Sequence, residues 1–136
     1  MIDNQKILFK FIQINNNVNW IYISYNYKLS ENFIKKFQNN VDWANISANQ
    51  KLSEEFIREF KDKVDWSIIS TNQNLSENFI RKFQDKVVWF KISAYQKLSE
   101  SFIKKFQDEV YWRIIYKNQK LSENFKEKFK YKLNGR

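Results

Sequence analysis

Residues 43–64 read WANISANQKLSEEFIREFKDKV, and this wording returns with small changes along most of the chain. Tryptophans fix the period, because successive tryptophans are 23 residues apart: Trp20, Trp43, Trp66, Trp89 and Trp112. An Ile, a Leu, a Ser-Glu pair and two Phe keep the same spacing in every unit. A fixed period of this length is typical of repeat proteins, in which each unit buries its apolar face against its neighbours.

Each unit is predicted to fold as two short helices. In the second helix, Ser53 is a natural N-cap, because its hydroxyl can accept an unpaired N–H of the first turn. The apolar residues Phe56, Ile57, Phe60 and Val64 then fall on one helical face. This pattern predicts a helix that buries a Phe-rich side.

The first helix of each unit is predicted to begin at the tryptophan, after a capping residue such as Asp42 or Asp65. Trp43 and Ile46 are three residues apart, so both should point inward. Asn49, near the end of this helix, is expected to take the left-handed conformation that closes many helices.

The pattern predicts an all-α fold, namely an α-solenoid of stacked short helical hairpins forming one domain over residues 1–136. The five expected repeats are 20–42, 43–65, 66–88, 89–111 and 112–134. Residues 1–19 are expected to form a capping half-repeat with a longer helix, with Phe11, Ile14 and Val18 at core positions. An all-β fold is disfavoured, because the chain has no Pro and a single Gly for tight turns.

The wording of residues 43–64 resembles tandem repeats in uncharacterised proteins of amoeba-infecting giant DNA viruses, the mimivirus-like group. The resemblance covers about residues 20–133. It implies a viral protein that acts in the cytoplasm of an infected host or is carried in the virion. No catalytic activity is attached to this repeat, and helical repeat proteins of this general kind often act as adaptors.

The composition argues against an enzyme. The chain has no His and no Cys, which excludes serine–histidine and cysteine–histidine nucleophiles and ordinary zinc sites. The Glu after each capping Ser is expected to place negative charge at a helix N-terminus. A catalytic carboxylate pair would need two unlike environments, whereas identical repeats supply like ones. We therefore expect no catalytic residue, no cofactor and no metal.

The sequence gives no sign of membrane insertion or secretion. No run of 18 apolar residues exists, and the N-terminus does not resemble a signal peptide. We expect an intracellular protein that does not enter a membrane.

Protein–protein interaction or scaffolding is the preferred function. The two residues after each tryptophan vary between repeats, and a solenoid can present such positions on a constant frame. Exposed aromatic residues among them would be natural anchors for a protein partner. The candidate contacts are Tyr22, Asn45, Ile68, Phe90 and Arg113.

Nucleic-acid binding is the alternative, because the net charge is +9. Most of the excess lies in residues 112–136, where eight Lys or Arg face two Glu. The candidate contacts there are Lys126, Lys128, Lys130, Lys132 and Arg136. In the earlier repeats each basic residue four positions after a Glu is expected to pair with it, as in Glu31 and Lys35.

The tryptophans offer a second route to nucleic acid, because a row of indoles can stack bases. However, each Trp shares a helical face with an Ile, and that face must meet the Phe-rich helix. The core interpretation of the tryptophans is therefore favoured. The sequence leaves the partner's identity and the oligomeric state open.

Overall fold

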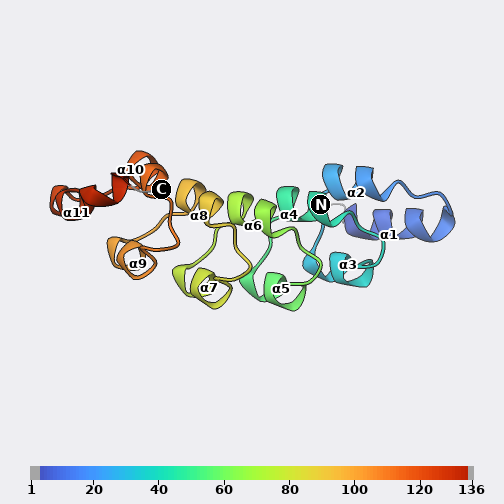
Figure 1. Cartoon of the computed structure of the whole chain (residues 1–136). Coiled ribbons are helices and arrows are strands. Elements are labelled where there is room, and N and C mark those ends of the chain that lie inside the picture. Colours follow the sequence, from blue (N-terminus) through green and yellow to red (C-terminus); the bar gives the residue numbers. More distant parts are fainter. Residues whose placement is uncertain (1–3, 135–136) are drawn as a thin grey trace. The chain divides into compact units, whose positions relative to one another are not determined.

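The computed structural model describes residues 4–134, and in this range it contains helices and connecting turns but no strand (Figure 1). The predicted all-α repeat fold is confirmed, since each 23-residue repeat forms two short helices. The chain divides into two compact units, Met1–Asp65 and Trp66–Arg136. Each unit is described by itself.

The first unit contains one longer helix and two repeats. Its helices are α1 (Asn4–Ile14), α2 (Trp20–Asn26), α3 (Glu31–Lys36), α4 (Trp43–Asn49) and α5 (Glu54–Glu59). Helices α2 and α4, the first helices of the two repeats, pack side by side. Helices α3 and α5 lie in a second row on the other side of the connecting turns (Figure 1).

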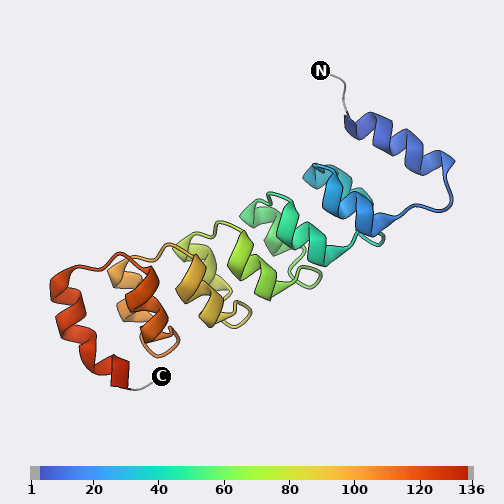
Figure 2. The ribbon, with the colours of Figure 1, turned by 90° about the horizontal axis from the view of Figure 1, so that it is seen from above.

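The second unit contains three repeats. Its helices are α6 (Trp66–Asn72), α7 (Glu77–Lys82), α8 (Trp89–Tyr95), α9 (Glu100–Lys105), α10 (Trp112–Asn118) and α11 (Glu123–Phe129), followed by the 3-10 helix η1 (Lys130–Asn134). Helix α8 packs against both α6 and α10, and the three lie roughly parallel when seen from above (Figure 2).

The tryptophans pack against the Phe rings of their own repeats, and Trp112 is buried while the other four are half-buried. Trp89 is half-buried and lies against the two Phe of its own repeat, with ring centroids 6.3 Å from Phe102 and 5.2 Å from Phe106. Its indole N–H donates to the carbonyl of Gln84 at 3.0 Å. The ring and its polar atom are thus already engaged, which leaves this indole poorly placed to stack on a base.

Both kinds of predicted helix cap are present. The Ser53 hydroxyl accepts the N–H of Phe56 at 3.1 Å, and the Asp42 carboxylate accepts the N–H of Asn45 at 3.2 Å. The expected left-handed conformation of Asn49 is wrong, because none of the described residues has a positive φ. Asn49 remains helical, and the chain leaves the helix through Gln50 in an extended conformation, with φ −97° and ψ 142°.

A ladder of buried or half-buried glutamines explains this extended exit. The side chain of Gln96 donates to the carbonyls of Ser70 and Gln73, both at 2.8 Å, and accepts the N–H of Leu75 at 3.0 Å. Gln50 and Gln119 make the same three contacts with the repeats before them. Each of these side chains therefore closes the turn of the preceding repeat, including a carbonyl that the helix end leaves unpaired.

A fully buried serine forms a second polar contact in four of the five repeats, and Tyr116 takes its place in the last. The Ser70 hydroxyl accepts the N–H of Val88 at 3.1 Å and donates to the carbonyl of Trp66 at 2.7 Å. Ser24, Ser47 and Ser93 also accept an N–H from 18 residues further along. Because these groups are shielded from water, losing one partner leaves the other unsatisfied.

We expect Ser70→Ala to lower the free energy of unfolding by about 1–3 kcal/mol, because the Val88 N–H loses its acceptor. Ser67→Ala is the matched control, since Ser67 is exposed in the same helix. That control should change stability by less than about 0.5 kcal/mol, as alanine suits a helix well. Urea denaturation followed by circular dichroism measures both, and equal effects would contradict the proposed role of the serine.

Candidate functional site

The two variable positions after each tryptophan differ in exposure. The first is exposed in all five repeats: Ile21, Ala44, Ser67, Phe90 and Arg113. The second is half-buried in four repeats, and exposed only at Tyr22. The sequence showed that both positions vary, but the angle of about 100° between successive helical residues decides which one faces solvent.

Three of the five predicted partner contacts are therefore accessible: Tyr22, Phe90 and Arg113. Asn45 is half-buried, and its amide donates to the Asp42 carboxylate at 2.6 Å and accepts from Asn49 at 3.2 Å. Ile68 is also half-buried. These two half-buried side chains have less surface available to a partner than the three exposed ones.

In the second unit, Ile68, Phe90 and Arg113 lie on helices α6, α8 and α10, respectively. Helix α8 packs between the other two. The Phe90 ring is 44% exposed and meets the Tyr111 ring edge-on at 5.5 Å. This contact orients an aromatic side chain that still presents much of its surface to solvent.

Three of the C-terminal lysines have a carboxylate partner. Lys126 lies 3.5 Å from Glu123, Lys130 lies 2.8 Å from Glu127, and Lys132 lies 3.5 Å from Asp108. The hydrogen bond to Glu127 and the charge of that carboxylate raise the pKa of Lys130. These pairs weaken the positive potential of the predicted nucleic-acid contact, although exposed pairs break easily.

Lys128 and Arg136 complete the predicted basic contact. The Lys128 ammonium lies 5.7 Å from the ring centre of Phe129. Arg136 lies outside the described residues. Lys128 is thus the only lysine of the four described ones that has no carboxylate partner in the range 4–134.

The expected pairing of Glu31 with Lys35 is wrong. The Glu31 carboxylate instead accepts the N–H of Ser53 at 2.7 Å and its hydroxyl at 2.9 Å, and Lys35 pairs with Glu59 at 2.8 Å. Glu77 and Glu100 bind the capping serine of the following repeat in the same way. The stacking of repeats brings the N–H and the hydroxyl of a capping Ser to each carboxylate. This Glu therefore links one repeat to the next, in addition to lying in the first turn of its own helix.

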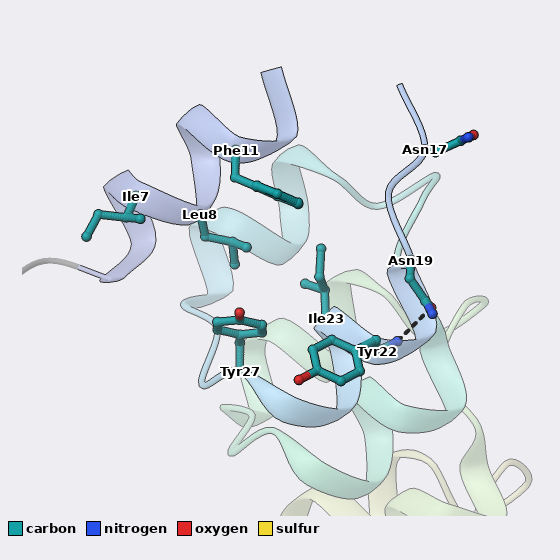
Figure 3. A pocket seen from close by; sticks show the side chains of 8 residues that line it. All are labelled: Ile7, Leu8, Phe11, Asn17, Asn19, Tyr22, Ile23 and Tyr27. Carbon is teal, nitrogen blue, oxygen red and sulfur yellow. Dashed lines mark hydrogen bonds between the residues drawn. The ribbon is translucent and has the colours of Figure 1, made fainter. Parts of the chain in front are cut away.

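An apolar hollow of about 370 Å³ lies between α1 and α2, and the sequence did not predict it (Figure 3). It is lined by Ile7, Leu8, Phe11, Asn17, Asn19, Tyr22, Ile23 and Tyr27. The predicted longer N-terminal helix is confirmed, since α1 has 11 residues. However, the expected core positions are wrong for two of its residues, because Phe11 is 50% and Ile14 is 79% exposed.

The anchoring of α1 explains this difference. Gln5 donates to the carbonyl of Lys28 at 2.6 Å and accepts the N–H of Ser30 at 3.2 Å. Leu8 is the buried residue of the helix, and the Phe9 ring lies 6.0 Å from that of Phe37. These contacts hold Gln5, Leu8 and Phe9 against the first repeat. Phe11 borders the hollow next to Ile23 and keeps half of its surface exposed, and Ile14, the last residue of the helix, is largely exposed (Figure 3).

The described part of the chain holds no cluster of three or more Asp or Glu placed to bind a metal ion. Within residues 4–134, no helix has the length and apolar character needed to cross a bilayer. Comparison of the chain with protein-family models, curated proteins and solved structures finds no match.

Proposed function

We propose that this chain is a non-enzymatic interaction module that binds another protein through exposed side chains on its repeated frame. The observation that carries this proposal is the exposure of the first residue after every tryptophan. These five positions differ in size and charge, whereas the buried Ile, Phe, Ser and Gln around them recur. A constant core with varied exposed positions is the arrangement by which repeat proteins recognise partners.

Aromatic side chains are the expected anchors of this interaction. Tyr22 and Phe90 are 55% and 44% exposed, and each is held on a helix by an edge-on contact with a neighbouring Tyr ring. A large ring that is already oriented loses little conformational entropy on binding, which favours its use as an anchor. The resemblance to repeats of mimivirus-like viruses supports a role in an infected host cell or in the virion.

Selection of a displayed library of random 16-residue peptides on the immobilised full chain tests the proposal. We expect binders whose affinity, measured by fluorescence anisotropy, falls at least about tenfold with Tyr22→Ala or with Phe90→Ala. Tyr95→Ala is the matched control, because Tyr95 is an exposed aromatic residue in the same helix as Phe90 but outside the row after the tryptophans. An absence of binders, or binders insensitive to both variants, would contradict the proposal.

Nucleic-acid binding by the C-terminal lysines is the second candidate, favoured by the concentration of positive charge in residues 112–136. Because three of these lysines are paired with carboxylates, we expect oligonucleotide binding only at low ionic strength. Anisotropy of labelled single- and double-stranded oligonucleotides across a salt series measures this. Binding that persists at physiological salt, and is lost with Lys126→Ala and Lys128→Ala together, would reverse our preference.

A further inference from the structure

The hollow between α1 and α2 lies in a stretch of the chain that has positive charge and no negative charge. Residues 4–30 contain Lys6, Lys10 and Lys28 but no Asp or Glu. Every repeat, including the first, begins its second helix with a Glu, but the carboxylate of the first of these, Glu31, already accepts the N–H and hydroxyl of Ser53. The surface near the hollow therefore differs from the mixed charge of the repeats.

The hollow has a buried apolar floor and exposed apolar walls. Leu8 and Ile23 form the floor, being 5% and 4% exposed, while Phe11, Tyr22 and Tyr27 are 41–55% exposed (Figure 3). The rings of Tyr22 and Tyr27 meet edge-on with centroids 6.3 Å apart. A volume of about 370 Å³ is large enough for one or two apolar side chains of an incoming chain.

Unpaired lysines lie next to these walls on α1. Lys6 and Lys10 line a second groove of about 520 Å³ on the same helix, together with Lys36 of α3, and Ile7 borders both depressions. None of these three lysines has a carboxylate partner among residues 4–134, unlike the paired lysines near the C-terminus. The Lys36 ammonium lies 4.3 Å from the ring centre of Phe9. Lys6 and Lys10, which lack a carboxylate partner among residues 4–134, favour a ligand that carries negative charge next to its apolar part.

This charge argues against a second copy of the chain as the occupant. The chain carries a net charge of +9, and its C-terminal stretch, like residues 4–30, has an excess of lysine. An anionic lipid surface would match the lysines, but a flat surface does not fill a hollow with a buried floor. A projecting apolar side chain does fill it.

We propose that the hollow between α1 and α2 binds an acidic segment of a partner protein, which inserts a Leu, Ile or Phe side chain and places Asp or Glu beside Lys6 and Lys10. This inference rests on the proposed function, and it assigns that function one site and one class of ligand. The apolar insertion supplies affinity, and the charges supply selectivity and a faster association rate.

Two matched displayed peptide libraries test the inference on the full chain. Both libraries consist of helical peptides that carry Leu, Ile, Phe or Trp at the same positions. The remaining positions are acidic in one library and basic in the other. We expect binders from the acidic library only, with affinity reduced at least about tenfold by Phe11→Ser and by Lys10→Glu. Ile14→Ser and Lys51→Glu are the controls, because both residues are exposed but line neither depression, and they should change affinity less than about twofold.

The other outcomes separate the two proposals. Equal recovery from the basic library would overturn the acidic assignment. Acidic binders that lose affinity with Phe90→Ala but not with Phe11→Ser would overturn this site and leave the proposed function standing. No binder from either library would count against both. Phe11-dependent co-sedimentation with phosphatidylserine vesicles, without peptide binding, would replace the peptide by a lipid surface.

Discussion

Replacing Gln96 by leucine is expected to lower the free energy of unfolding by about 3 kcal/mol or more, although leucine is apolar and of similar size. The substitution removes one acceptor and two donors, so that the N–H of Leu75 and the carbonyls of Ser70 and Gln73 lose their partner together. Gln96 is 5% exposed, which leaves little room for water to replace these bonds. The apolar gain of leucine offsets only part of this cost.

Gln84→Leu is the matched control for this prediction. Gln84 is exposed, and its side chain makes one hydrogen bond, to the carbonyl of Arg81 at 3.0 Å. The control should cost less than about 1 kcal/mol, because water can satisfy the freed carbonyl. Urea denaturation followed by tryptophan fluorescence measures both variants. Equal losses would show that the buried glutamine acts only as a space-filling residue.

The helices and the capping residues at their N-termini could be predicted, because both are encoded by residues that are close together in the sequence. Ser53 lies three residues before the N–H that it caps, and the period of 23 residues repeats that arrangement. The glutamine ladder could not be predicted in this way. Gln50 binds groups that lie 21 to 26 residues earlier, so in the sequence it looked like an ordinary turn residue. Its recurrence in four of the five repeats, with Tyr27 in the first, was the available signal.

The candidate sites were predicted less completely than the fold. Periodicity identified Tyr22 and Phe90 as variable residues, but exposure depends on the direction of each side chain around a short helix. The hollow at α1 was missed because residues 1–19 lack the tryptophan and the Ser-Glu pair that set the register elsewhere. Gln5, which donates to the carbonyl of Lys28 and accepts the N–H of Ser30, sets the register of α1 instead.

Two phenylalanines of one repeat should respond very differently to alanine. Phe102→Ala is expected to cost about 3–5 kcal/mol, because it leaves a cavity beneath Trp89 and removes a ring 4.6 Å from Phe106. Phe102 is 3% exposed, so its apolar surface is almost fully withdrawn from water in the folded chain. The repeat depends on this ring because the two Phe and the Trp pack as one cluster.

Phe90→Ala is expected to cost less than about 1.5 kcal/mol, because its main loss is one edge-on contact with Tyr111 and alanine favours the helix. Parallel urea titrations of the two variants measure the difference, and circular dichroism should show native helix content for Phe90→Ala. Similar losses for both would mean that Phe90 belongs to the core. A large loss confined to Phe102 would leave Phe90 as a side chain that the fold does not need, so that any effect of Phe90→Ala on peptide binding reports on recognition rather than on folding.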